Sequence, residues 1–347
     1  MTRNIIDIDG AQGEGGGQVL RTALAVALCR QQAVRVFNIR RYRPRPGLQR
    51  QHLIAVEAAA AISCGTVEGA NPGSQEILFS PESLSGGTYT FDIGSAGSTT
   101  LVAQTLLPAL VTADLGCELT LRGGTHNPLA PPFEFLDRVY LALLRRMGAR
   151  AEGRLVRHGF FPAGGGEIKL TVQPTTELLP LRLDRLAGAP EIRARIKLAN
   201  LPLHIAERER DTLLKRPGLD FPAVHIEPVE ADGPGNVVMV TVERPGLTEL
   251  FTGHGRRGIA AEEVALTVAR DVAHHVESLA PVGPFLADQL VLPLALSGGG
   301  SFVTCAPTSH TRTQTALVER LLGVPVRVVH VTGQLWRVET GPSTPSG

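Results

Sequence analysis

Residues 285–322 read FLADQLVLPLALSGGGSFVTCAPTSHTRTQTALVERLL, and the rest of the chain can be interpreted outward from this stretch. The apolar segment 286–296 predicts a helix, the glycines at 298–300 end it, and residues 301–305 predict a short strand. A proline turn then leads to His310 at the start of a second helix with one apolar side. The alternation of helix and strand predicts a mixed α/β fold.

His310 is the first candidate for chemistry. With Ser309 it would lie at a helix entrance, where free N–H groups and the positive end of the helix dipole favour an anion. A histidine in this place can also be an ordinary polar residue. The neighbouring glycine run, Asp288-Gln289 and the strand-to-helix turn favour a catalytic role, because a neutral imidazole can attack phosphorus and hold the group covalently.

Composition indicates a globular protein with room for two domains, or for one large domain with an insert. The chain has 347 residues, of which 43% are apolar and 19% charged. No apolar run reaches the ~18 residues that span a bilayer. No signal-peptide pattern begins the chain, so we expect no membrane association and a cytoplasmic location. The four cysteines are widely spaced and are predicted to be reduced and buried.

A glycine-rich turn, DGAQGEGGGQ, occupies residues 9–18 between a predicted strand and a predicted helix. Such turns let backbone amides approach phosphates, but neither a Walker A loop nor a dinucleotide fingerprint is present. Glu14 would repel phosphate unless a divalent cation lay between them, which predicts a metal ligand. Arg21, one turn into the helix, is predicted to contact phosphate.

An arginine-rich segment follows at residues 40–50, RRYRPRPGLQR. The chain as a whole is not strongly basic, since its formal net charge is +1. The segment can be a solvated loop, but next to a phosphate-binding turn it is a candidate for gripping a polynucleotide backbone. The predicted RNA-binding residues are Arg40, Arg41, Arg43, Arg45 and Arg50.

Pairs of predicted helices recur along the chain. They begin near Gly17 and Gly47, near Ser98 and Phe133, and near Pro284 and His310. We infer a threefold repeat of a two-helix, several-strand module, with the sheets inside and the helices packed against them. These modules would form one large domain.

Residues 184–278 interrupt this repeat with a β-α-β-β-α order of their own. We expect residues 1–183 to form modules one and two, 184–278 a small inserted α/β domain, 279–340 the third module, and 341–347 a disordered tail. His274 and His275 on the last inserted helix are interpreted as surface residues, because adjacent helical residues point to different sides.

Several motifs together resemble RNA 3′-terminal phosphate cyclases, in order and over almost the whole chain. They are DGAQGEGGGQVLRTAL, RPRPGLQRQHL, IGSAGSTTLVAQTLLPAL, GGTHNPLAPP, RHGFFPAGGGE, GPGN, LADQLVLPLAL and the turn at His310. The resemblance implies three repeated modules and an inserted thioredoxin-like domain. It also implies ATP-dependent conversion of an RNA 3′-phosphate into a 2′,3′-cyclic phosphodiester, through AMP on a histidine and an RNA(3′)pp(5′)A intermediate.

By this resemblance the nucleophile is His310 and the metal ligand is Glu14, with Mg²⁺ or Mn²⁺ as the cation. The adenylate pocket is implied to comprise Gln104, Pro131, Phe135, Phe285, Leu286, Ala287, Asp288 and Gln289. Phe285 stands where the family often has tyrosine, and Thr313-Gln314 where Thr-Asn is usual. The expected partner is RNA with a 3′-terminal phosphate.

Three other functions stay open at this point. They are a non-catalytic cyclase-like protein of ribosome assembly, an enolpyruvyl transferase with a similar repeated architecture, and a regulator that binds ATP without turnover. The cyclase-like relatives lack the histidine, so His310 favours an enzyme. The general base, the physiological RNA and the oligomeric state also stay open, a homodimer being one option.

Overall fold

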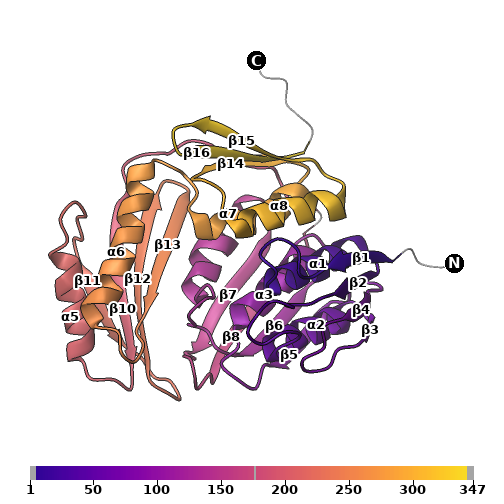
Figure 1. Cartoon of the computed structure of the whole chain (residues 1–347), viewed down its shortest axis with the longest axis horizontal. Helices are drawn as coiled ribbons and strands as arrows, with labels where there is room; N and C mark the ends of the chain where they lie inside the picture. The colour runs from indigo at the N-terminus through magenta and orange to yellow at the C-terminus, as the bar shows by residue number, and fades with distance from the viewer. Residues whose placement is uncertain (1–4, 176, 342–347) are drawn as a thin grey trace.

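The computed structural model describes residues 5–175 and 177–341, so residues 342–347 of the expected tail lie outside the described residues. The mixed α/β class is confirmed: four sheets are combined with helices (Figure 1). None of the helices in the described ranges has both the length and the apolar character needed to cross a bilayer.

The first sheet has an arrangement of strand pairings that also occurs in the second and third sheets. In spatial order its strands are β1 (Ile6–Asp9), β2 (Val34–Phe37), β4 (Ile77–Ser80) and β3 (Thr66–Glu68). β1 and β2 are parallel, and the other two pairings are antiparallel. Helices α1 (Gly17–Arg30) and α2 (Arg50–Ile62) follow β1 and β2 in the chain.

The second and third sheets repeat one parallel and two antiparallel pairings. The second contains β5 (Gly87–Asp92), β6 (Cys117–Gly123), β8 (Gly166–Gln173) and β7 (Arg150–Arg157). The third contains β9 (Leu181–Leu183), β14 (Gly300–Thr304), β16 (Leu335–Thr340) and β15 (Val326–Thr332). Their helices are α3 (Thr99–Leu110), η1 (Phe135–Leu141), α4 (Ala142–Arg146), α7 (Pro284–Leu296) and α8 (Ser309–Leu322).

The layering is the reverse of the one predicted. Helices α1, α3, α7 and α8 pack on one another in the middle, and the sheets lie around them (Figure 1). Nearly every side chain of α1 and α3 is buried, whereas strands such as β6 and β8 alternate between buried and more exposed residues. A helix that is apolar all round must be covered on every side, while an alternating strand needs cover on one face only.

The interrupting segment forms its own sheet and core. Its elements are β10 (Glu191–Ala199), α5 (His204–Leu214), β11 (Val224–Pro228), β12 (Gly235–Arg244), β13 (Leu247–His254) and α6 (Ala261–Ser278). The predicted β-α-β-β-α order was wrong, because β13 was missed. A turn at Pro245-Gly246 returns the chain antiparallel to β12, and the buried Glu249 obscures the apolar pattern of β13.

Two smaller expectations also need correction. His275 is buried and its ring lies 5.2 Å from that of Phe251, so only His274 is a surface residue. All four cysteines are free, as expected, but Cys64 is exposed and only Cys117 and Cys305 are buried.

A buried ion pair joins the inserted segment to the second module. Lys197 of β10 donates to Glu134, the residue before η1, at 2.5 Å, and also to His158 at 3.0 Å. The second Glu134 oxygen lies 2.8 Å from His126 Nε2. Burial acts to raise the pKa of Glu134, but His126 and Lys197 outweigh it and hold that pKa well below the ordinary value. Paired charges therefore connect strand β10 to the residues that precede η1.

Replacing Lys197 by methionine should lower the free energy of unfolding by about 3 kcal/mol, because it leaves the Glu134 carboxylate buried and poorly compensated. Arg193→Met on the same strand is the control: its pair with Glu191 is about half exposed and should be worth less than about 1 kcal/mol. Urea denaturation of both variants measures the difference. Equal losses would mean that Lys197 does not anchor the domain.

Candidate functional site

A cavity of about 680 Å³ is lined by residues from four parts of the chain, 14–52, 101–140, 250–254 and 284–314. The N-terminal ends of α1, α7 and α8 reach it, and β13 contributes Leu250, Thr252 and His254. The predicted site residues that line it are Glu14, Arg21, Arg40, Arg43, Gln104, Pro131, Phe135, Phe285, Asp288, Gln289 and His310.

The remaining predicted residues lie elsewhere. Leu286 and Ala287 are buried in the core behind the cavity wall. Arg41 and Arg45 are exposed on the loop before α2. Arg50 begins α2, and its Nε donates to the carbonyl of Ile93 at 2.9 Å, so it ties α2 to the end of β5.

Two hydrogen bonds connect His310 to residues far away in the sequence, and together they form a relay. Its Nδ1 lies 3.0 Å from Gln18 Oε1, and Gln18 Nε2 donates to Asp288 Oδ2 at 2.8 Å. Because a carboxylate oxygen accepts from the amide nitrogen, the amide oxygen must face His310, and Nδ1 must carry the imidazole proton. Nε2 then keeps its lone pair, and within the described residues it makes no hydrogen bond. Nε2 is therefore the ring nitrogen that could act as a nucleophile.

The glycine turn is fitted against the start of α8. The Glu14 amide donates to Thr313 Oγ1 at 3.0 Å. The hydroxyl of Thr22 on α1 donates to the side-chain oxygen of Gln314, the next residue of α8, at 2.6 Å. Gly13 has φ +60°, and a Cβ there would overlap the Thr313 side chain. Any side chain at position 13 would therefore force the turn away from α8.

Buried charges surround the relay. Burial lowers the pKa of Arg21 to about 10, partly offset by Glu14 and Asp288. Burial raises the pKa of Asp288 to about 7, against hydrogen bonds from the backbone and the charge of Arg21. Arg21 thus stays cationic at neutral pH and offers positive charge inside the cavity, whereas Asp288 titrates near neutrality.

Glu14 is already engaged in the structure. Arg43 Nη2 pairs with its carboxylate and donates to its backbone carbonyl at 2.9 Å, while His310 Nδ1 lies 4.0 Å from the carboxylate. No group of three histidine, cysteine or acidic side chains able to hold a metal exists in the described part of the chain. A cation at Glu14 would need further oxygens from a bound nucleotide, as Mg²⁺ sites with one or two carboxylates do.

Part of the cavity lining is apolar. Pro131, Phe135 and Phe285 belong to it, and the Gln104 amide nitrogen, which also lines the cavity, donates to the amide oxygen of Gln289. Aromatic and apolar walls of this kind suit a planar base. Phe285 is itself held edge-on by Phe251 of β13, with ring centroids 6.4 Å apart.

Gln18 and His52 are functional candidates that the sequence did not single out. His52 lines the cavity, and its Nδ1 accepts from the Gln49 amide at 3.2 Å. Burial, with Arg21 and Arg40 nearby, lowers the pKa of His52 to about 3, so it is neutral. Gln18 lies near the start of α1 and His52 near the start of α2, each next to a candidate motif. Only the packing of distant helices shows that both side chains face the cavity.

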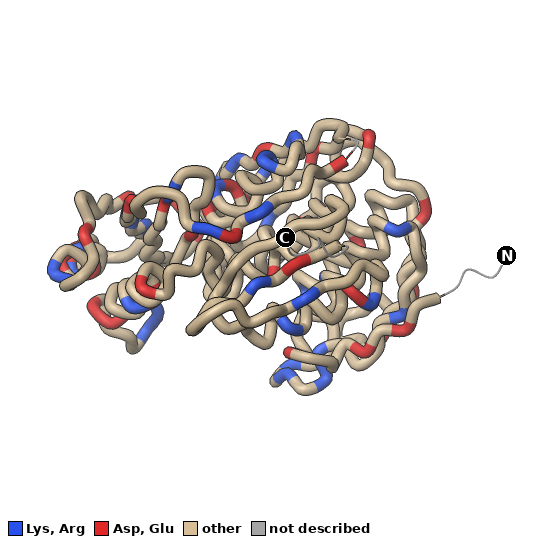
Figure 2. The backbone as a smooth tube through the Cα atoms, turned by 90° about the horizontal axis from the view of Figure 1, so that it is seen from above, with Lys and Arg blue, Asp and Glu red and all other residues tan. Residues whose placement is uncertain are grey.

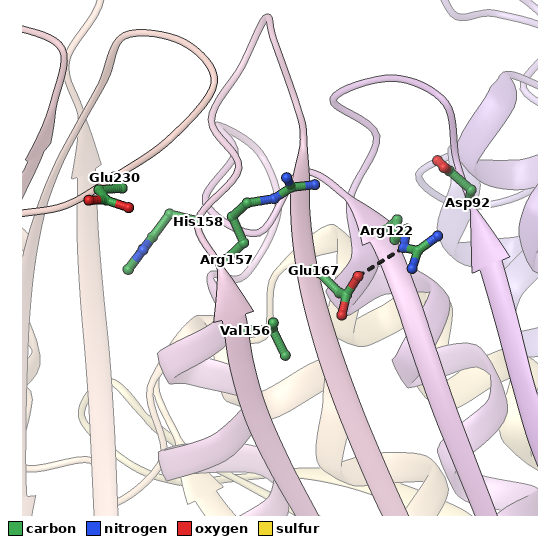
Figure 3. Close-up of a pocket in the computed structure, with 7 residues that line it drawn as sticks. All are labelled: Asp92, Arg122, Val156, Arg157, His158, Glu167 and Glu230. Atoms are coloured by element: carbon green, nitrogen blue, oxygen red, sulfur yellow. Dashed lines mark hydrogen bonds and ion pairs between the residues drawn. The ribbon is translucent and has the colours of Figure 1, made fainter.

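A second hollow, of about 770 Å³, lies at the carboxyl ends of β5, β6 and β7. Figure 3 shows Arg122 paired with Glu167 there, and His158 between Arg157 and Glu230. With Asp92, three carboxylates face two guanidinium groups, and burial lowers the pKa of His158 to about 4. The charges of this hollow sum to −1, which would repel phosphate groups, so the cavity at His310 is the better candidate for phosphate chemistry.

Asp288 gives a pH-dependent prediction. Since its folded pKa lies above its unfolded value of about 3.9, its contribution to stability is full below about pH 4 and is lost as pH rises to about 7. The free energy of unfolding should fall by up to about 1.4 kcal/mol per pH unit in that window. Asp288→Asn, which still accepts from Gln18, should remove this slope.

Urea denaturation between about pH 5 and pH 8 measures the slope. Asp211→Asn, at a half-exposed carboxylate, serves as the control and should run parallel to the wild type. A wild-type curve parallel to that of Asp288→Asn would show that Asp288 ionises normally in the folded state.

The sequence comparison agrees with this geometry. A family model described as RNA 3′-terminal phosphate cyclase matches residues 12–328, which include most of the glycine-rich turn, the arginine-rich segment and His310. The matched range also covers the inserted domain, so the resemblance is not confined to one module. The chain belongs to the RNA 3′-terminal phosphate cyclase family.

Proposed function

We propose that this protein is an ATP-dependent RNA 3′-terminal phosphate cyclase that works through AMP bound to His310. The observation that carries the proposal is the relay from Asp288 through Gln18, which leaves His310 Nε2 as a free lone pair at a cationic cavity. Family membership supports an RNA substrate and cyclase-type chemistry. A non-catalytic role in ribosome assembly is disfavoured, because such a protein would not need this histidine geometry.

In the first step His310 Nε2 attacks the α-phosphorus of ATP. The new N–P bond forms as the P–O bond to pyrophosphate breaks, and pyrophosphate carries the electron pair away. Arg21 stabilises negative charge that develops on the phosphates, because it is buried and cationic. A base between Pro131, Phe135 and Phe285 would hold the nucleotide in line with the imidazole.

In the second step an oxygen of the RNA 3′-phosphate attacks the phosphorus on His310. The N–P bond breaks, and the electron pair returns to the imidazole. The ribose 2′-hydroxyl then attacks the 3′-phosphorus, AMP leaves, and the hydroxyl proton is released. Proximity drives this closure, since the nucleophile and the phosphorus belong to the same nucleotide.

A divalent cation at Glu14 would neutralise phosphate charge during the first step. Glu14 and Arg43 already form an ion pair, so the cation and the guanidinium are alternative partners of one carboxylate. Arg43, once released from Glu14, is free to bind the RNA phosphate. The same carboxylate therefore connects the nucleotide step with the RNA step.

His310→Asn should fold normally and form no acid-labile, alkali-stable adduct with ATP labelled at the α-phosphate. His330→Asn is the matched control, because His330 is an exposed histidine on β15, away from the cavity. Incubation with a divalent cation followed by denaturing electrophoresis measures the adduct. Full labelling of folded His310→Asn would refute the nucleophile, and an unlabelled wild type would refute the adenylation mechanism.

Arg43→Ala should slow AMP transfer from His310 to a 3′-phosphate oligonucleotide by about 10-fold or more, since it removes one charge-assisted contact. Arg193→Ala is the control, because Arg193 is a half-exposed arginine of β10 that does not line the cavity and is not part of the arginine-rich segment. It should stay within about twofold of the wild type. Single-turnover transfer from preformed enzyme-AMP measures both rates, and equal rates would place the RNA phosphate elsewhere.

A further inference from the structure

Tyr42 is a large aromatic side chain that the folded chain leaves uncovered. It is 78% exposed, and its hydroxyl makes no hydrogen bond within the described residues. Its one ring contact in that part of the chain is with Arg41, whose Cζ lies 5.9 Å from the ring centroid. One ring face is therefore next to a guanidinium, and no other aromatic ring covers the second face.

The loop that carries Tyr42 is held in a defined shape. Arg40 has φ +52°, and its Nη1 donates to the carbonyls of Arg45 at 2.6 Å and Gly47 at 2.8 Å. The Arg43 amide also donates to the Arg40 carbonyl at 3.0 Å. A loop closed on itself by these bonds fixes the backbone on both sides of the tyrosine. Its exposure is therefore built into the fold.

The position of the loop relates Tyr42 to the catalytic cavity. Arg40 and Arg43 line the cavity, and Arg43 reaches the Glu14 carbonyl, while Tyr42 between them does not line it. A substrate whose terminal phosphate enters at Arg43 must leave the rest of its chain outside. Tyr42 lies on the loop that this outer part has to pass.

Charge and shape together select the ligand. Blue and red segments are interspersed along the chain in Figure 2, so a polyanion gains little from the molecule as a whole and most from the arginine loop. An aromatic ring among arginines suits single-stranded nucleic acid, because bases stack on the ring while phosphates bind the guanidinium groups. Stacking tolerates any base, since every base has a π-face.

We propose that Tyr42 is a stacking platform for a nucleobase near the 3′ end of the RNA, at or next to the terminal nucleotide. This inference rests on the proposed function, because it assumes that the RNA phosphate reaches His310. It assigns to the loop a contact with the base, in addition to the phosphate contacts of the arginines. The platform would make the enzyme prefer an unpaired 3′ end with stackable bases.

The test uses Tyr42→Ala, with Tyr42→Phe as the matched variant that keeps the ring. Tyr42→Ala should raise the RNA concentration for half-maximal AMP transfer by about 5- to 100-fold, the range that base stacking contributes. Tyr42→Phe should stay near the wild type. Labelling of His310 by ATP should be equal in all three proteins, which also shows that they are folded.

Oligonucleotides with a single abasic site identify the base. An abasic site at the terminal or the adjacent nucleotide should weaken transfer by the wild type and have little further effect on Tyr42→Ala, because both changes remove the same stack. Equal abasic penalties in wild type and Tyr42→Ala, or unchanged transfer by Tyr42→Ala, would overturn the proposal.

Equilibrium binding keeps the two hypotheses separate. Fluorescence anisotropy with a 3′-phosphate oligonucleotide and His310→Asn, with and without Tyr42→Ala, measures stacking without any adenylation. If the wild type forms no adduct but Tyr42→Ala still weakens binding, the proposed function fails and the platform stands. If neither protein binds the oligonucleotide, the platform is refuted.

Discussion

The cavity at His310 depends on one hydrogen-bonded relay, in which Gln18 of α1 joins Asp288 of α7 to His310 of α8. The three residues come from helices of the first and third modules, with more than 200 residues of chain between α1 and α7. The relay can form only because α8 packs directly on both α1 and α7 in the middle of the molecule. Packing of apolar helices therefore determines which ring nitrogen of His310 donates to Gln18.

The inserted domain completes the cavity from the other side. Glu249 of β13 accepts from the Gly283 amide at 2.7 Å, at the start of the helix that carries Phe285 and Asp288. Burial raises the pKa of Glu249 to about 8, so this carboxyl group is mostly protonated at neutral pH. Together with the Phe251–Phe285 ring contact, it connects the position of α7 to the inserted sheet. The insertion is thus part of the site, and not an appendage of the large domain.

Charged and apolar residues both line the cavity. Arg21, Arg40 and Arg43 lie near Glu14, whose negative charge acts on Arg21 and Arg40, while Pro131, Phe135 and Phe285 supply apolar surface. The Glu14 carboxylate pairs with Arg43, so its charge is compensated inside the protein. Removing Arg43 would leave that carboxylate less well compensated at a position where its side chain is largely buried.

The sequence by itself determined the fold class, most element positions and most residues that line the cavity, and it singled out His310 as the candidate nucleophile, because these follow from local patterns: glycine turns, apolar periodicity and charged segments. It did not show that the helices lie inside the sheets, nor that β13 exists with its buried Glu249. Gln18, His52 and the anchoring role of Arg50 also required the tertiary structure. Local patterns show which side of an element is apolar, but partners such as Gln18 and His310 are 292 residues apart, and only packing decides that they meet.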